Sequence, residues 1–346
     1  MRAVILSGPK KLDLIHVKNP ESDGKNVIIR VTACGICGSD LHYWELGVGM
    51  DGLPGLIMGH EFCGMVHDPG NRQDLKKGER VTALSINPCG VCKNCMSSHS
   101  NICMDGLKRP NPGNNSPGAY AEYISVRPDM VRKLPDTVSE KEAALIEPAS
   151  VALHAVTLAD IRIGDSVLIT GGGPIGVLCA VWARIHGAGF VVLSEPDVYR
   201  IAFSKEQGFF DRVLDATDTD INKKIRKITC GGADVAIETS AAEAGIQTAI
   251  SSLKTSGRLV MAGISFRPQS VPTLTVTMKE LTIKAAFAYV PSEFDLTIDF
   301  LSKKKISIEA LVTSEIQLEK VQHTFEQFGL KNQKNMKVLI RPFIYH

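Results

Sequence analysis

Residues 167–176 read VLITGGGPIG, a short apolar run that leads directly into a glycine-rich turn. The run predicts a strand, and the segment 177–186 that follows has a helical pattern. In this context Gly171 permits a tight turn, Gly173 lets the backbone approach a pyrophosphate, and Gly176 lets helix and strand pack closely. The stretch therefore predicts a dinucleotide site in which the amino end of the helix faces the phosphates.

An acidic residue follows at the end of the next predicted strand. Glu195 lies nineteen residues after Gly176, where a carboxylate can accept hydrogen bonds from the adenosine ribose. This position favours NAD over NADP, because a 2′-phosphate would face the carboxylate. Arg200 could accommodate a phosphate, but we interpret it as stacking on adenine or packing along the ribose edge. The expected cofactor-binding residues are Gly171, Gly173, Pro174, Ile175, Gly176, Glu195 and Arg200.

The surrounding pattern predicts an α/β protein with two domains, as a chain of 346 residues usually has. Short apolar runs at 167–169, 191–193, 235–237 and 259–261 alternate with helical segments, which indicates βαβ units and a parallel sheet. The first 150 residues instead contain turn formers and β-branched runs such as 27–31, so this part is predicted to be mostly β. Residues 337–340 could form a strand that rejoins it.

Four cysteines, Cys89, Cys92, Cys95 and Cys103, lie close together in the first part of the chain. Four thiolates at this spacing suit a closed tetrahedral zinc site, so we predict structural zinc in a lobe at about 86–106. Disulfides are the alternative, but no signal peptide is apparent and a reducing compartment favours metal. An iron–sulfur cluster is a second alternative, although there the fourth cysteine comes sooner and precedes proline.

A second group of residues has the ligand types of a catalytic zinc, which keeps three protein ligands and one open position. Cys37 and His60 are the first two candidates, and the third is Glu61 or Glu147. A thiolate, a neutral imidazole and one carboxylate neutralise Zn²⁺, whereas a second carboxylate would make the site anionic. We therefore expect one glutamate to bind directly and the other to act through water. Two zinc ions per chain are expected in all.

Composition excludes several other classes of function. Lysine and arginine total 39 against 37 acidic residues, which gives no reason to expect a nucleic-acid or membrane partner. The apolar run at residues 3–6 is too short for a signal peptide, and no apolar stretch is long enough to span a bilayer. These features predict a cytoplasmic enzyme with reduced thiols.

Together the motifs resemble the zinc-containing medium-chain dehydrogenase/reductase family over nearly the whole chain. They are Gly35-Ile36-Cys37-Gly38-Ser39-Asp40, Gly59-His60-Glu61, the four cysteines, Gly118-Ala119-Tyr120-Ala121-Glu122-Tyr123, Ile146-Glu147-Pro148 and the turn 171–176. The resemblance implies a GroES-like catalytic domain at 1–150 and 289–346 and a Rossmann NAD-binding domain, a doubly wound parallel sheet, at 151–288. It also implies a homodimer or homotetramer.

Within that family, residues 41–45 and 147–151 are most similar to the polyol branch, which includes sorbitol, galactitol-phosphate and 2,3-butanediol dehydrogenases. The resemblance implies that Ser39 accepts the substrate proton and His42 relays it to solvent, while hydride passes to the nicotinamide. It also places Tyr43 and Tyr289 in the substrate pocket. Ala288 departs from the arginine typical of animal sorbitol enzymes, which argues against sorbitol itself. The resemblance implies a polyol or diol as the substrate, with or without a phosphate.

Two other functions fit the same motifs. L-threonine 3-dehydrogenases share the zinc and nucleotide layout, and a β-hydroxy amine could chelate zinc as a diol does. A nucleotide-binding protein with structural zinc only is an alternative of another class. The full set of catalytic candidates, Ser39, His42 and Glu147 with Cys37, His60 and Glu61, favours an enzyme.

Overall fold

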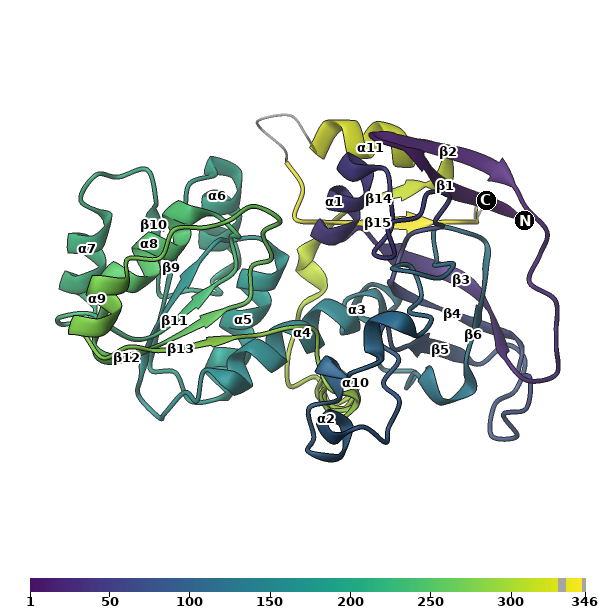
Figure 1. The fold of residues 1–346 in the computed structure, drawn as a ribbon, viewed down its shortest axis with the longest axis horizontal. Coiled ribbons are helices and arrows are strands. Elements are labelled where there is room, and N and C mark those ends of the chain that lie inside the picture. The colour runs from purple at the N-terminus through teal and green to yellow at the C-terminus, as the bar shows by residue number, and fades with distance from the viewer. Residues whose placement is uncertain (329–333, 344–346) are drawn as a thin grey trace. The chain divides into compact units, whose positions relative to one another are not determined.

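The computed structural model describes residues 1–328 and 334–343, and the chain divides into two compact units (Figure 1). The first unit comprises Met1–Glu147 and Val290–His346, and the second comprises Pro148–Tyr289. The sequence-based bounds were 1–150 with 289–346 and 151–288. Helix α4 (Ile146–Leu158) begins in the first unit and continues in the second.

The second unit contains a six-stranded parallel sheet in the order β10-β9-β8-β11-β12-β13. This order, in which the chain starts in the middle and reverses direction once, is the Rossmann arrangement. The strands are β8 (Ser166–Thr170), β9 (Phe190–Glu195), β10 (Arg212–Asp215), β11 (Ala233–Glu238), β12 (Leu253–Met261) and β13 (Thr282–Ala285). The helices between them are α5 (Pro174–Ile185), α6 (Val198–Gln207), α7 (Ile221–Ile228), α8 (Glu243–Ser252) and α9 (Thr273–Met278).

Both faces of this sheet are covered. Successive strand residues point to opposite faces, yet Val167, Leu168 and Ile169 are all fully buried. Leu168 belongs to a core cluster with residues of α7 and α8, including Ile225 and Ile250. A central strand buried on both sides explains why residues 167–169 form an unbroken apolar run instead of alternating with polar residues.

The first unit is built on a sheet in which β3 is central. Its strands follow the order β14-β15-β3-β4-β5-β7, and β6 also pairs with β3. These strands are β3 (Val27–Gly35), β4 (Glu61–Asp68), β5 (Arg80–Ala83), β6 (Tyr123–Val126), β7 (Val131–Lys133), β14 (Val312–Gln317) and β15 (Lys337–Arg341). The helices of this unit are α1 (Gly38–Leu46), α2 (Lys93–Met96), α3 (Glu140–Ala144), α10 (Pro291–Ser302) and α11 (Val321–Phe328).

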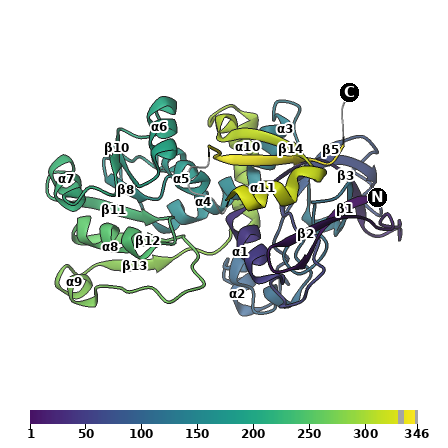
Figure 2. The ribbon, with the colours of Figure 1, turned by 90° about the horizontal axis from the view of Figure 1, so that it is seen from above.

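A separate hairpin of β1 (Arg2–Gly8) and β2 (Lys11–His16) packs beside α11 (Figure 2). Gln322 of α11 connects them: its side-chain oxygen accepts from the Leu12 backbone N–H at 2.7 Å, and its amide donates to the Lys10 carbonyl at 3.2 Å. The amino-terminal hairpin is thereby attached to an element that follows it by about three hundred residues.

The predicted α/β fold is confirmed, with a mixed sheet in one unit and a parallel sheet in the other. All four strands predicted from 167–169, 191–193, 235–237 and 259–261 are present. Residues 337–340 form β15, which pairs with β3 of the first unit. In the described part of the chain, no helix combines the length and apolar character needed to cross a membrane.

Candidate metal centres and nucleotide site

Two neighbouring antiparallel strands place Cys37 beside His60. Strand β3 ends at Gly35 and β4 begins at Glu61, and these two residues are register partners. Cys37 follows β3 directly as the N-cap of α1, while His60 immediately precedes β4. The pairing of β3 with β4 therefore brings the two candidate ligands together, although they lie far apart in the sequence.

The ligand atoms of Cys37, His60 and Glu61 all lie within 4.8 Å of one another, and His60 and Glu61 are buried. Gly35 makes room for this group, since a Cβ added there would lie 2.1 Å from Glu61 Oε2. A partly exposed thiol, a buried imidazole and a buried carboxylate that converge on one point are the donor set of a zinc site with an open position. The residues fit the metal.

Lys337, at the start of β15, contacts a candidate metal ligand, and the sequence did not point to it. Its side chain is almost fully buried, and its Nζ donates to Glu61 Oε1 at 2.9 Å, to Glu61 Oε2 at 2.6 Å and to the Ile36 carbonyl at 3.0 Å. Burial lowers the pKa of Lys337, but the charges of Glu61 and Cys37 outweigh it, and the net shift is upward. A charged lysine therefore offsets the Glu61 carboxylate.

This lysine changes the charge argument about the two glutamates. The sum of ligand charges expected from the sequence did not include a positive charge beside Glu61. The net negative charge expected for a site with two carboxylates was therefore too large. With Lys337 included, Zn²⁺ can be accompanied by Cys37, Glu61 and Glu147 without an excess of negative charge among these groups.

Glu147 lies in the first turn of α4, is buried, and accepts a hydrogen bond from the Ser85 hydroxyl at 2.8 Å. Burial raises its pKa to about 7; His60 opposes this shift and Glu61 adds to it. Glu147 is not grouped with Cys37, His60 and Glu61 at ligand distance. Ser85, just after β5, is a second partner that the sequence did not reveal.

Asp40 is a third residue whose contacts with the candidate ligands the sequence did not reveal. It occupies the N3 position of α1, is fully buried, and its Oδ2 accepts the Cys37 backbone N–H at 2.9 Å. Its Oδ1 lies 3.7 Å from His60 Nδ1, and neither atom has a hydrogen-bond partner among the described residues. A carboxylate facing the spare nitrogen of a histidine is the usual outer partner of a metal-bound imidazole.

Ser39 and His42 both lie on α1, three residues apart and partly exposed. Side chains at this spacing lie on the same face of a helix. The helix therefore presents the two proton-transfer candidates together, one turn from Cys37.

The two tyrosines expected in the substrate pocket belong to different units. Tyr43 lies on α1, and its hydroxyl bonds Asn114 Oδ1 at 3.2 Å. Burial raises its pKa, so its hydroxyl stays protonated and available for hydrogen bonding. Tyr289 is fully buried in the second unit.

The four cysteines of the lobe are also brought together. Their sulfur atoms lie within 4.8 Å of one another, with pairs at 3.5 Å for Cys92 and Cys95 and 3.9 Å for Cys92 and Cys103. A tetrahedral zinc with Zn–S bonds of about 2.3 Å requires sulfur–sulfur separations of about 3.8 Å. Backbone N–H groups lower the pKa of Cys92 to about 6, which favours the thiolate that a metal needs.

The nucleotide turn has the geometry that its glycines predict. Gly171 has a φ of 100°, and a Cβ there would lie 2.8 Å from the Ser240 backbone nitrogen. A Cβ on Gly176 would lie 1.9 Å from the Gly171 carbonyl oxygen. Gly173 is the N-cap of α5, followed by Pro174 at the first helical position. This leaves the amino end of α5 open for an anion.

Glu195 ends β9 and is buried, with each carboxylate oxygen accepting a backbone N–H. The donors are Gly172 and, at 2.8 Å, Asp197. The carboxylate is therefore fixed beside the glycine turn. The Arg200 guanidinium passes close to Gly173, since a Cβ on this glycine would lie 3.7 Å from Arg200 Nη1. Both residues lie beside the glycine turn.

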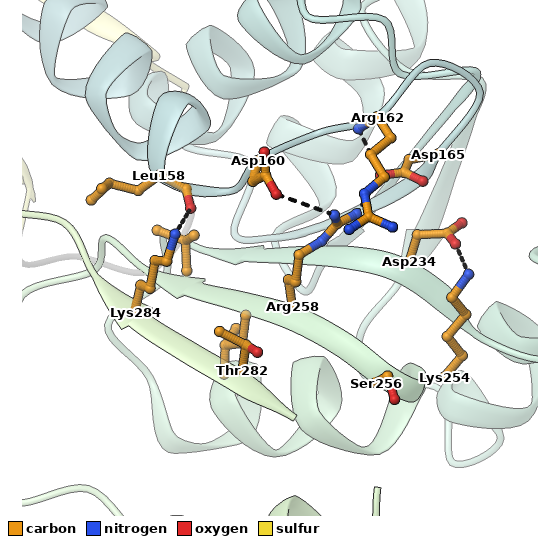
Figure 3. A pocket seen from close by; sticks show the side chains of 12 residues that line it. Leu158, Asp160, Arg162, Asp165, Asp234, Lys254, Ser256, Arg258, Thr282 and Lys284 are labelled. Atoms are coloured by element: carbon orange, nitrogen blue, oxygen red, sulfur yellow. Dashed lines mark hydrogen bonds and ion pairs between the residues drawn. The ribbon is translucent and has the colours of Figure 1, made fainter. Parts of the chain in front are cut away.

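A cavity of about 290 Å³ lies elsewhere in the second unit, near the amino ends of β11, β12 and β13 (Figure 3). Five of its charged side chains form ion pairs, since Arg258 faces Asp160 and Asp165 and Lys254 contacts Asp234. The glycine turn follows the carboxyl end of β8, so this cavity is not the dinucleotide site.

Family models match both units. Residues 23–136 match the alcohol dehydrogenase GroES-like domain, and residues 174–303 match the zinc-binding dehydrogenase domain. D-xylulose reductase A of Aspergillus niger is 32% identical over 332 residues, covering 94% of this chain and 90% of the relative. Sorbitol dehydrogenase of Bacillus subtilis is 31% identical over 350 residues, covering 99% of this chain and 97% of the relative.

Solved structures agree with these matches. The 2R,3R-butanediol dehydrogenase of Bacillus subtilis superposes with a TM-score of 0.87 at 28% identity, covering 99% of both chains. Two further structures of this fold, at 27% and 26% identity, contain NADP and NADH respectively.

Fold, metal-ligand clusters and glycine turn together define a zinc-binding dehydrogenase. With relatives of more than 30% identity over nearly their whole length, the chain belongs to the zinc-containing medium-chain dehydrogenase/reductase family, in its polyol branch.

Proposed function

We propose that the protein oxidises a secondary alcohol of a polyol or diol with NAD, in a reaction that depends on a catalytic zinc held by Cys37, His60 and Glu61. The convergence of these three ligand atoms within 4.8 Å is the observation that carries the proposal. The names of the polyol-branch relatives support the substrate class.

In this proposal Glu61 binds the metal directly and Glu147 acts through a water molecule. Glu61 stands with Cys37 and His60 at ligand distance, and Lys337 compensates its charge. Glu147 is held by Ser85. When bound, zinc supplies the Lewis acidity that lowers the pKa of the alcohol, and NAD accepts the hydride.

The chain's own residues would handle the proton and the cofactor. Ser39 accepts the hydroxyl proton through a hydrogen bond, and His42, on the same face of α1, passes it to solvent. Tyr43 contributes a protonated hydroxyl to the substrate side of this helix, and we retain Tyr289 as a substrate contact from the family pattern. The glycine turn and Glu195 bind the NAD pyrophosphate and ribose.

NAD is favoured by the buried Glu195 carboxylate, which a 2′-phosphate would approach. Arg200 lies close enough to Gly173 to contact a phosphate of either cofactor. Steady-state rates with NAD and NADP test this assignment, and an NADP preference would contradict it. In the matched variant Glu195→Gln, the ratio of the rate with NAD to the rate with NADP is expected to be smaller than in the wild type.

The substrate class is tested by a screen of diols, polyols, polyol phosphates and L-threonine, following NADH formation with and without a chelator. Oxidation of a polyol or diol that the chelator abolishes supports the proposal. L-threonine as the best substrate, or no chelator-sensitive activity at all, contradicts it.

We further propose a homodimer or homotetramer in the cytoplasm. Large apolar side chains are exposed along one stretch of the second unit, with Phe266, Leu274 and Met278 each more than 60% accessible, as expected of surfaces that another chain covers. The free thiols of the zinc ligands require a reducing compartment. Light scattering of the purified protein tests the assembly, and a monomer would contradict it.

A further inference from the structure

Asp40 connects the two candidate ligands Cys37 and His60. Its Oδ2 accepts the backbone N–H of Cys37 at 2.9 Å, while its Oδ1 faces His60 Nδ1 at 3.7 Å. For Oδ1 to face the imidazole, the carboxylate must be held in one orientation. One hydrogen bond from Cys37 leaves the carboxylate free to turn about that contact.

A second donor removes this freedom. The Tyr120 hydroxyl donates to the same Asp40 Oδ2 at 2.7 Å, and both groups are fully buried. In a buried site no solvent competes for these two hydrogen bonds. With two donors on Oδ2, the other oxygen is directed at His60.

Tyr120 is itself rigidly placed. Its backbone N–H donates to the Met58 carbonyl at 2.9 Å, and its carbonyl accepts the Val4 N–H at 2.8 Å. Its ring fills the space beside Gly59, where a Cβ would lie 2.4 Å from the ring. Gly59 has a φ of 96° and directly precedes His60. Tyr120 therefore touches the His60 loop with its ring and Asp40 with its hydroxyl.

We propose that Tyr120 is a positioning residue of the catalytic metal centre, whose hydroxyl fixes the Asp40 carboxylate so that Asp40 orients the His60 ring. The role rests on the proposed zinc at Cys37 and His60. Tyr120 does not touch the metal or the substrate in this account, and it acts only through Asp40.

Tyr120→Phe tests the role because it removes one oxygen and keeps the ring that packs on Gly59. Outer partners of metal ligands change metal affinity by about 10- to 100-fold, so a residue one step further out is expected to accelerate release of the catalytic zinc by roughly 3- to 30-fold. Zinc release to a chromogenic chelator measures this. The zinc of the four cysteines is an internal control. The Cys37→Ala variant shows which phase of the zinc-release trace belongs to it.

Three further measurements separate positioning from general destabilisation. Tyr123→Phe, which removes a tyrosine hydroxyl from a ring packed on His67 and Phe343, should leave both release rates unchanged. In an Asp40→Asn background, Tyr120→Phe should have little additional effect, because the two residues act in series. The visible spectrum of the cobalt-substituted protein should change in Tyr120→Phe and not in Tyr123→Phe.

The outcomes are distinguishable. Faster release of the catalytic zinc alone, with loss of the effect in the Asp40→Asn background, supports the role. Unchanged release, or equal acceleration of both zincs, overturns it while leaving the proposed function intact. A wild-type protein that holds zinc only in the cysteine lobe overturns the proposed function and this role together.

Discussion

The ion pair between Lys337 and Glu61 places a buried positive charge beside a candidate metal ligand. Both side chains are almost fully excluded from solvent, and they are bonded twice, at 2.9 and 2.6 Å. The pair links β15, near the end of the chain, to the first residue of β4. A buried pair of this kind contributes little net stability but is costly to break.

Lys337→Met is therefore expected to reduce the free energy of unfolding by about 3–5 kcal/mol, because it leaves Glu61 buried without its partner. Urea unfolding of the metal-free protein, in which no zinc offsets the Glu61 carboxylate, measures this. Lys337→Arg is the conservative control, and the double variant Lys337→Met with Glu61→Gln should recover most of the loss. A loss below about 1 kcal/mol in Lys337→Met would show that Glu61 is not held by this charge.

Glu147 gives a prediction about pH. Burial raises its pKa to about 7 from an ordinary value of 4.5. Between these two values the folded protein holds a proton that the unfolded chain releases, so this group favours folding at low pH. Its contribution to the stability of the metal-free protein should fall as pH rises from about 4.5 to 7 and stay constant above that range.

Glu147→Gln cannot titrate and should lack this dependence. The test is urea unfolding of metal-free wild type and variant at pH 5 and pH 8. The stability of the wild type relative to the variant should decrease between the two pH values. An equal difference in stability between wild type and variant at both pH values would mean that the pKa of Glu147 is not raised in the folded protein.

In the strand–turn–helix unit of β8, the glycine turn and α5, glycine residues serve two different purposes. A Cβ on Gly176 would lie 1.9 Å from the Gly171 carbonyl, whereas a Cβ on Gly173 would meet only the Arg200 side chain, at 3.7 Å or more. Gly176 is needed for packing within the unit. Gly173 leaves open the surface that a pyrophosphate would approach.

Gly173→Ala should consequently fold with a stability within about 0.5 kcal/mol of wild type, as is usual for substitutions that create no clash, while raising the KM for NAD by roughly tenfold. Gly176→Ala should lower the free energy of unfolding by about 1–3 kcal/mol, as overpacking usually does. Thermal unfolding and steady-state kinetics with varied NAD distinguish the two. The assignment is contradicted if Gly173→Ala is unstable or binds NAD normally.

The sequence predicted several elements whose pattern is local. The apolar run 167–169 and the spacing of the four cysteines each indicated their structure without tertiary information, and the strands and the sulfur cluster are present. Strand β13, whose residues Thr282–Ala285 are all exposed, was not identified. Its sequence has no apolar run, because an edge strand with solvent-exposed side chains does not need one.

The partners of the metal ligands were harder to predict. Lys337 lies 276 residues from Glu61, and Ser85 lies 62 residues from Glu147. Asp40 was within a recognised motif, but its contact with Tyr120 spans 80 residues. These pairings depend on strand order and burial, which no spacing rule contains, and a lysine at a strand start usually indicates a solvent-exposed position.

At the scale of the whole molecule, the chain combines a unit that carries both candidate metal clusters with a unit that carries the dinucleotide turn. In the proposed reaction a metal supplies the Lewis acidity and a bound dinucleotide accepts the hydride. Neither unit alone supplies both. The account therefore depends on a metal at Cys37 and His60 in addition to the structural metal in the cysteine lobe.

Zinc content measured together with NADH formation, in wild type and in Cys37→Ala, tests this dependence most directly. We predict two zincs per chain and chelator-sensitive polyol oxidation in the wild type. Cys37→Ala should keep one zinc, in the cysteine lobe, and lose NADH formation by at least about a thousandfold, as removal of a principal catalytic group does. A Cys37→Ala protein that retains both zincs and full activity would contradict the account.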